Sequence, residues 1–345
     1  MSSWALAFTT QAEACRALDS ALTAEICEAL LAHISVGEDS VSRRVRDWPG
    51  DLSYRGDSVP LRLCGALHAL VLEGKDPALA QAYAGPPTGD LQEVINNTLQ
   101  YHTDYILDFI DLPPQTNEVG RSGAIIAAAW HLTALFPAAS FKALELGASA
   151  GLNLNFYRYH LVANNNNETA PDTVLLTPDW RGAVPARHSL RIDEAAGVDI
   201  NPLDPLRDAL RMKAYIWPDQ PQRLARMDAA LSIARAHPPK VDKADAAEWL
   251  EAQLDQPSQT GRLVYHTIAA QYFPPRTRER IEAALQRAGE TASDHAPLAH
   301  FSMESSPTTG ADLLLRVWSK GRLREWHLGQ ADAHARWIDW QPEEI

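Results

Sequence analysis

One short stretch, residues 143–154, concentrates the residue types that could do chemistry. An apolar run that carries Glu145 is followed by small residues from Gly147 to Gly151, and the pattern then turns helical. This order predicts a strand, a tight loop and a helix. Small residues let backbone amides approach a ligand, and a helix N-terminus carries about half a positive charge. A carboxylate at the strand end accepts hydrogen bonds from an ammonium group or a ribose hydroxyl, which favours a cationic ligand such as S-adenosylmethionine.

Two other interpretations use nearly the same letters. The dinucleotide fingerprint Gly-x-Gly-x-x-Gly fits poorly, because Gly147, Ser149 and Gly151 follow one another at a spacing of two. The nucleophile elbow of α/β-hydrolases, Gly-x-Ser-x-Gly, fits letter for letter. Helices rather than strands are predicted before Ser149, and no His-Gly-Gly oxyanion loop precedes it. The order Ser149, Asp245, His327 nevertheless permits a triad, so a serine hydrolase stays an alternative.

Composition limits the kinds of partner. The formal net charge of -13 argues against a phosphate-binding surface, so we expect no nucleic-acid partner. Cys15, Cys27 and Cys64 are scattered, which indicates packing residues in a reducing compartment rather than disulfides or a zinc site. Neither an 18-residue apolar run nor a secretory signal is present, so we expect a cytoplasmic protein without a membrane segment or a metal.

An all-helical domain is predicted for residues 1–114. Apolar residues recur at a spacing of four from Ala14 to Leu30, and short β-branched runs are absent. Further helix starts are indicated at Ser58, Asp76 and Asp90. The helical pattern stops at Pro113-Pro114, so a second domain, residues 115–345, is expected to follow.

A dense polar loop, residues 115–122, lies between two apolar helices. Asn117 and Ser122 are typical helix-capping residues, with Glu118 in the first turn, so capping is one interpretation. The other is a second wall of the ligand site. Arg121 would then pair with a ligand carboxylate in bidentate geometry.

Strands and helices alternate after the central stretch, which predicts a mostly parallel, doubly wound sheet. A surface loop is expected at residues 164–167 and an inserted hairpin near residues 173–193. An apolar strand then ends at Asp199, followed by Asn201, and this carboxylate could hold both ribose hydroxyls. Asp245 stands where a helix N-cap is expected, and also where an adenine amino group would find an acceptor.

His266 and Tyr272 are the candidates for catalysis. His266 lies at the end of the fourth central strand, and Tyr272 follows closely. Strand ends of a doubly wound sheet face the ligand crevice, where imidazole can act as a general base. Tyr272 or Glu304 would complete the rim. A structural histidine bonded to a backbone group is the alternative.

The C-terminal segment closes the pattern. A fifth strand, residues 299–304, precedes two apolar runs joined through Lys320-Gly321, which predicts an antiparallel hairpin. With this layout, residues 141–345 resemble the Rossmann-like class I S-adenosylmethionine-dependent methyltransferases. The resemblance implies that the first motif is residues 145–151, that Asp199 is the ribose acid and that Asp245 is the adenine acid. Asp199 departs from the pattern, because it lies farther from Gly151 than about twenty residues.

At a finer level the chain resembles an uncharacterised bacterial family, domain of unknown function 2332. The matching segments are residues 61–68, 115–122, 145–154 and 197–202. Together these features predict a methyltransferase with a helical cap and a small-molecule substrate, with a non-catalytic ligand-binding protein as a second possibility. The expected S-adenosylmethionine contacts are Asn117, Glu118, Arg121, Glu145, Gly147, Ala148, Ser149, Gly151, Asp199, Asn201 and Asp245.

Overall fold

The computed structural model describes residues 2–85, 91–115, 117–163, 173–188, 191–256, 258–307 and 310–345. The chain forms two compact units. The first contains Met1–Thr116 and Asp208–Ala225, and the second contains Asn117–Arg207 and Arg226–Ile345. The segment 208–225 lies within the predicted second domain, but its contacts place it in the first unit.

The first unit is helical, as predicted. Its helices are α1 (Ser3–Ala17), α2 (Ala21–Val36), α3 (Ser40–Arg46), α4 (Val59–Leu72), α5 (Pro77–Tyr83), α6 (Leu91–Tyr101), α7 (Thr103–Ile110) and α9 (Ala209–Ala214). The predicted start at Asp76 is confirmed, because its side chain accepts a hydrogen bond from the Leu79 amide and caps α5. The predicted start at Asp90 lies outside the described residues.

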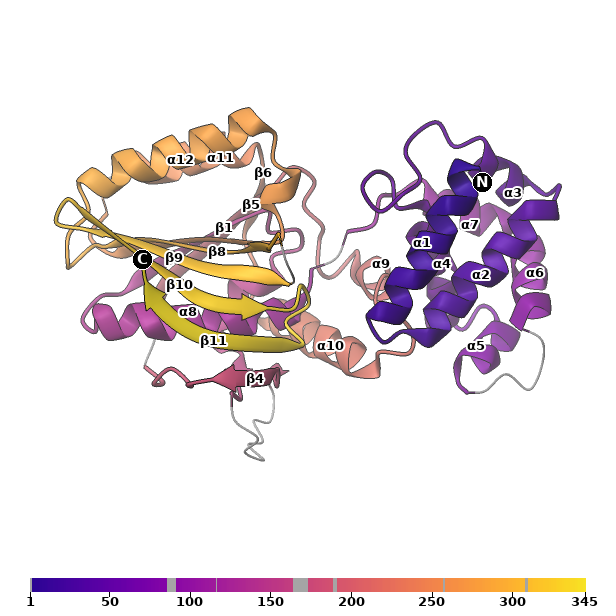
Figure 1. The fold of residues 1–345 in the computed structure, drawn as a ribbon, viewed down its shortest axis with the longest axis horizontal. Coiled ribbons are helices and arrows are strands. Elements are labelled where there is room, and N and C mark those ends of the chain that lie inside the picture. The colour runs from indigo at the N-terminus through magenta and orange to yellow at the C-terminus, as the bar shows by residue number, and fades with distance from the viewer. Residues whose placement is uncertain are drawn as a thin grey trace. The chain divides into compact units, whose positions relative to one another are not determined.

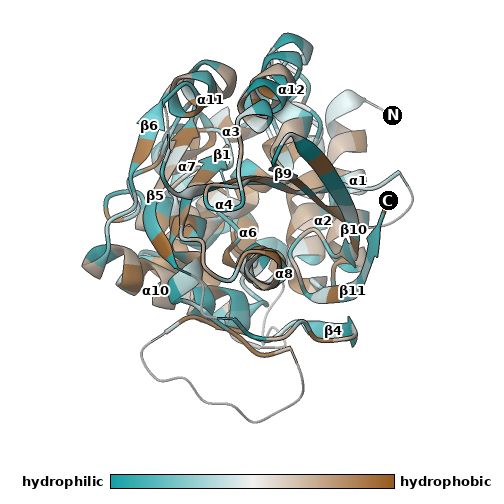
Figure 2. Cartoon of the chain, turned by 90° about the vertical axis from the view of Figure 1, so that its left-hand side faces the viewer, coloured by the Kyte–Doolittle hydropathy of each residue, from teal (hydrophilic) through white to brown (hydrophobic). Residues whose placement is uncertain are grey.

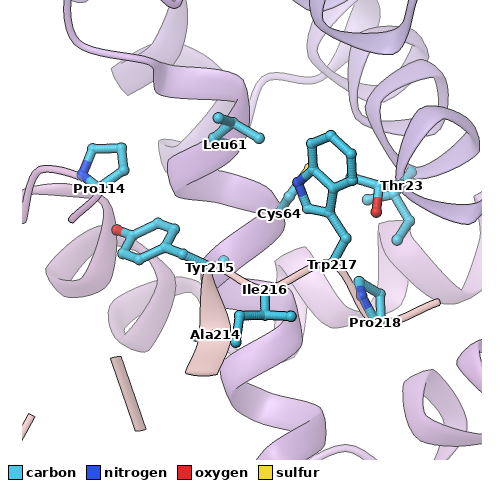
Figure 3. Close-up of a pocket in the computed structure, with 11 residues that line it drawn as sticks. Thr23, Leu61, Cys64, Pro114, Ala214, Tyr215, Ile216, Trp217 and Pro218 are labelled. Atoms are coloured by element: carbon cyan, nitrogen blue, oxygen red, sulfur yellow. The ribbon is translucent and has the colours of Figure 1, made fainter. Parts of the chain in front are cut away.

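The segment 208–225 completes the core of this helical unit. Trp217 is 9% exposed and packs in the same cluster as the apolar residues of α1 to α7. Tyr215 lies so close to α4 that a Cβ on Gly65 would be 2.8 Å from its ring, so a larger residue there would collide. A cavity of about 40 Å³ remains beside Cys64 and Trp217 (Figure 3). The first unit is therefore built from two separate parts of the sequence.

The second unit contains a nine-stranded mixed sheet in the order β4-β11-β10-β9-β8-β7-β1-β5-β6. Its strands are β1 (Phe141–Leu146), β4 (Asp179–Gly182), β5 (Ile192–Asp199), β6 (Val241–Lys243), β7 (Gly261–Thr267), β8 (Leu298–Ser305), β9 (Ala311–Ser319), β10 (Arg322–Ala331) and β11 (Trp337–Glu344). Five neighbouring strands, β6, β5, β1, β7 and β8, are parallel to one another. The next three pairs, β8 with β9, β9 with β10 and β10 with β11, are antiparallel.

Helices cover both faces of this sheet. α11 (Ala246–Leu254) and α12 (Pro275–Glu290) lie on one face, and α8 (Ser122–Leu135) lies on the other (Figure 1). Viewed on edge in Figure 2, the sheet separates these two layers, and α8 is markedly hydrophobic. Leu144 and Val264 pack against α11 and α12. α10 (Pro221–Ala236) continues the chain from the first unit into the second.

The order of the five parallel strands is that of a doubly wound sheet. In chain order β1 is first, β5 second, β6 third, β7 fourth and β8 fifth, so the spatial order is third, second, first, fourth, fifth. The order reverses between β1 and β7. In open α/β sheets ligands bind at such a switch point, outside the carboxyl ends of the strands.

Several local predictions differ from the structure. The helix expected after Gly151 is a 3-10 helix, η2 (Leu152–Arg158). The hairpin expected near residues 173–193 is absent from the described part of that range. β3 (Leu175–Leu176) pairs with β2 (His160–Leu161), and β4 pairs with β11. Residues 164–167, expected as a surface loop, and Ser189-Leu190 lie outside the described residues.

The C-terminal hairpin is confirmed, because β9 and β10 pair antiparallel through Lys320-Gly321. The next strand, β11, was not predicted. Within the described ranges, every helix is too short or too polar to cross a membrane.

Candidate functional site

The loop after β1 is held in a left-handed backbone conformation at three positions. Gly147, Ser149 and Gly151 have φ angles of 71°, 53° and 72°. Such angles are unfavourable for residues with a side chain, so Ser149 is strained and two glycines flank it. The hydroxyl of Ser149 is buried and has no hydrogen-bond partner among the described residues. A buried hydroxyl without a partner is uncommon in folded proteins, which marks this loop as a functional candidate.

The backbone amides of the loop bind protein groups. The amides of Gly147 and Ala148 donate to the Val198 carbonyl at 2.9 and 3.0 Å. The amide of Ser149 donates to Asp199 Oδ2 at 2.8 Å. The loop is therefore fixed to the end of β5. Its role in ligand binding would rest on side chains and on the remaining lone pairs of Asp199, rather than on these three amides.

Glu145 is a buried carboxyl group without an ion-pair partner among the described residues. It is 2% exposed, and its neighbours are the Tyr265 hydroxyl at 3.5 Å and Asn153. Burial raises its pKa well above the ordinary value of 4.5, and the negative charge of Asp199 raises the pKa further. The positive charge of Arg121 opposes this shift. The described residues therefore form no salt bridge with this carboxyl group, although Arg121 acts on it electrostatically.

Asp199 and Asn201 lie together at the end of β5. Asp199 Oδ2 accepts from the Ser149 amide, and Oδ1 accepts from the Asn201 amide at 2.8 Å. Each carboxylate oxygen has two lone pairs, so further acceptor capacity remains. The long separation of Asp199 from Gly151 has a simple cause, because β2, β3 and β4 are inserted between them.

Asp245 caps α11, as the capping interpretation predicted. Its Oδ1 accepts from the amides of Ala247 and Glu248 at 3.0 and 3.1 Å, and its Oδ2 accepts from the Thr277 hydroxyl at 3.0 Å. A contact to adenine would be additional to this cap.

The polar segment at residues 117–122 packs on the loop after β1. Asn117 Oδ1 accepts from the Leu152 amide at 2.8 Å, and Asn153 Nδ2 donates to the Glu118 carbonyl at 3.3 Å. Glu118 also caps the short helix η1 (Val119–Arg121) by accepting from the Gly120 amide. Thr116 of the same predicted loop lies outside the described residues.

Arg121 points to the carboxyl end of β7, where its Nη1 donates to the Thr267 carbonyl at 3.1 Å. Its Nε donates to the Ala333 carbonyl at 2.8 Å. The structure therefore brings the 117–121 segment to the same edge of the sheet as Glu145 and Asp199.

His266 forms a dyad with Glu304. Its Nδ1 lies 2.6 Å from Glu304 Oε1, and the same oxygen accepts from the amides of Ala269 and Ala270 at 2.9 and 3.0 Å. These bonds lower the pKa of Glu304 against the effect of its burial. An ionised Glu304 only accepts, so the proton of a neutral His266 resides on Nδ1. Its Nε2 has no hydrogen-bond partner among the described residues.

His266 and Glu145 lie on opposite faces of the sheet. Alternation along β7 places His266 on the face of Val264, which α11 and α12 cover, and Tyr265 on the other face beside Glu145. Tyr272 is 74% exposed, and its hydroxyl makes no hydrogen bond within the described chain. The ring near His266 is instead Phe273, with centroids 6.3 Å apart.

The three residues of the possible hydrolase triad are not hydrogen-bonded to one another. The Ser149 hydroxyl has no hydrogen-bond partner in the described part of the chain, and Asp245 accepts hydrogen bonds from the amides that it caps and from Thr277. His327 Nε2 lies 3.5 Å from Asp312.

Sequence reasoning missed two groups at this edge, Tyr265 and Asn153. Tyr265 is fully buried and donates to the Asn153 carbonyl at 3.2 Å as well as approaching Glu145. The Asn153 side chain also accepts from the Ser122 hydroxyl at 2.7 Å. The run Tyr265-His266-Thr267 at the end of an otherwise apolar strand was the available signal for Tyr265.

Fold and site together define a mixed α/β protein whose acidic residues gather at the carboxyl ends of parallel strands. The chain belongs to the bacterial family DUF2332, described as an uncharacterised protein conserved in bacteria, whose model matches residues 5–340. Comparisons with curated proteins and with solved structures give no significant match.

Proposed function

We propose that the protein is an S-adenosylmethionine-dependent methyltransferase that acts on a small-molecule acceptor. The observation that carries this proposal is Glu145, a buried carboxyl group at the strand-order reversal, with no ion-pair partner among the described residues. A ligand ammonium group would supply the missing cation. Such a contact would oppose the raised pKa of Glu145, because a bound cation favours the ionised form.

Other residues at this edge suit the rest of such a ligand. The Ser149 hydroxyl, which has no partner among the residues described, and the remaining lone pairs of Asp199 would accept hydrogen bonds from ribose hydroxyls. Asp245 and Asn117 would lie farther along the same edge. When bound, S-adenosylmethionine supplies a methyl group activated by a sulfonium. The protein's own task would then be to hold and align the acceptor.

His266 would remove the proton of the acceptor. Glu304 fixes the proton of the neutral imidazole on Nδ1, which leaves the Nε2 lone pair as the base. The two amides that also bind Glu304 hold the carboxylate in place. The acceptor would approach from the end of β7, since His266 is the penultimate residue of that strand.

Calorimetry with S-adenosylhomocysteine tests the cofactor claim. We expect binding to the wild type, and a loss of about tenfold or more in Glu145→Gln, because a hydrogen bond to a charged group contributes about 1.5–3 kcal/mol. Glu194→Gln is the matched control, since Glu194 lies near the opposite end of β5 and pairs with Lys142 at 3.0 Å. Absence of heat with folded wild-type protein at high ligand concentration would refute the proposal.

A fluorophosphonate probe separates the hydrolase alternative. We expect no labelling of Ser149, because no histidine of the described ranges is hydrogen-bonded to its hydroxyl. Labelling that disappears in Ser149→Ala would favour the hydrolase instead.

A further inference from the structure

A hollow of about 170 Å³ lies on the α8 side of the second unit, away from the strand ends described above. Its walls come from α8, from residues 183–188 after β4, and from β11. The lining residues are Trp130, His131, Ala134, Ala183, Val184, Pro185, Ala186, His188, Trp340 and Pro342. None of these lining residues is acidic, lysine or arginine. The hollow therefore suits an uncharged group.

The volume fits a single six-membered ring. An apolar cavity of about 150 Å³ in another protein binds benzene. Aromatic walls favour such a ring, because edge-to-face and offset contacts add about 0.5–1.5 kcal/mol beyond area burial. Trp130 and Trp340 provide these walls, and Trp340 also contacts Trp180 with centroids 5.9 Å apart.

The hollow is lined by two histidines, His131 and His188, and His131 is the one with a buried nitrogen that lacks a partner among the described residues. Neither ring nitrogen has a hydrogen-bond partner among the described residues, and Nε2 is buried whereas Nδ1 is not. The ring is held edge-on by Trp326 and Trp340, with centroids 5.5 and 6.5 Å away. Burial and the charge of Arg324 lower the pKa of His131, so the imidazole is neutral at pH 7. A neutral imidazole offers one donor and one acceptor.

We propose that this hollow binds a phenol ring whose hydroxyl is hydrogen-bonded to His131. A phenol hydroxyl both donates and accepts, so it matches a neutral imidazole in either tautomer. It is uncharged at neutral pH, since its pKa is about 10, and so needs no counter-ion in the lining. The site is independent of the proposed methyltransferase function.

Fluorine NMR titration of the full-length protein with 4-fluorophenol and fluorobenzene tests this site. We expect 4-fluorophenol to bind about threefold to tenfold more tightly, the contribution of one neutral hydrogen bond. In His131→Phe the two affinities should become equal, with that of fluorobenzene unchanged. Equal affinities in the wild type, or no binding of either up to its solubility, would overturn the proposal.

Two further variants protect the test from a folding artefact. Ala134→Leu adds volume at the wall of the hollow from an exposed helix position, and both ligands should bind more weakly. His295→Phe changes an exposed histidine outside the hollow, and both affinities should stay at the wild-type value. Unchanged binding in Ala134→Leu would place the ligands elsewhere and contradict the assignment.

A third ligand distinguishes the two possible sources of the phenol ring, a tyrosine side chain and a free phenol. N-acetyltyrosinamide presents the same ring with a peptide backbone. If it binds at least as tightly as 4-fluorophenol, the hollow receives a tyrosine side chain. Weaker binding assigns the site to free phenols.

Discussion

Single side chains at the strand ends were foreseen better than the contacts between them. Glu145, Asp199 and His266 were recognisable because each is a polar residue at the end of an apolar run. The His266–Glu304 dyad was not predicted as a pair. It depends on the register of β7 against β8, in which His266 is opposite Ser302 and Glu304 lies two residues beyond. Register is a tertiary property that two isolated strand patterns do not determine.

Burial of Glu145 predicts a pH-dependent stability. Its folded-state pKa is raised above 4.5, so the folded protein holds a proton that the unfolded chain releases as the pH rises above that value. The stability that the burial of Glu145 contributes is therefore fully present below pH 4.5 and is lost as the pH rises through the raised pKa of this group. Glu145→Gln mimics the protonated form, so its melting temperature should exceed that of the wild type at pH 7.

Thermal unfolding of both proteins at pH 4 and pH 7 measures this effect. A stability gain of 1 kcal/mol corresponds to about 2–4 °C in a domain of this size. The difference should shrink at pH 4, where the carboxyl group is protonated in both states. A variant that is less stable than the wild type at pH 7 would show that the ionised form is favoured by the fold.

Glu304 should show the opposite sign. Its hydrogen bonds to His266 and to two amides lower its folded-state pKa, so the stability it contributes is present above pH 4.5 and is lost as the pH falls through the lowered pKa. We expect Glu304→Gln to lose about 1–3 kcal/mol at neutral pH. Urea unfolding at pH 7 and at acidic pH measures the difference, and a pH-independent loss would contradict the role of the charge.

His266→Ala tests the base. The rate of methyl transfer should fall about a hundredfold or more, while the affinity for S-adenosylhomocysteine stays near that of the wild type. Kinetics and calorimetry on the same variant give both numbers. If rate and affinity fall together, His266 instead supports the structure of the site.

At the scale of elements, the sequence predicted the helical front, the five parallel strands and the closing hairpin. These depend on hydrophobic period and on turn residues, which are local. The inserted hairpin was wrong within the described residues, because apolar residues around 175 find a partner in β2 and not in the segment that leads into β5. Strand pairing across a long insertion depends on which edges are free in the folded sheet, which local patterns do not encode.

At the scale of elements we predict the stability cost of replacing Gly151, which lies in the loop between β1 and η2. Its φ is 72°, and a Cβ there would lie 2.6 Å from Val241 Cγ2 and 2.8 Å from Pro239 Cβ. Gly74 has a similar φ of 67° with nothing within 4 Å, so it isolates the backbone term. We expect Gly74→Ala to cost about 1–2 kcal/mol and Gly151→Ala to cost more. Urea midpoints of the two variants measure this difference. Equal losses of stability would show that β6 shifts at little cost to accommodate the added methyl group.

At the scale of the whole molecule, the first unit needs a distant segment. A fragment of residues 1–114 lacks Tyr215 and Trp217, which pack against α4 and into the helical core. We expect this fragment to bind a hydrophobic dye and to unfold without a sharp transition. Adding a peptide of residues 208–225 should restore cooperativity. A fragment that already unfolds cooperatively on its own would show that the core is complete without the segment.

The divided first unit also has a consequence for synthesis on the ribosome. About 90 residues of the second unit are translated before the segment that completes the helical core, so at about 5–20 residues per second the delay is about 5–18 seconds. During this interval the nascent helices expose the apolar surface that Trp217 later covers. Such surface is what holding chaperones recognise, and the first unit cannot complete its core until the first segment of the second unit has been made.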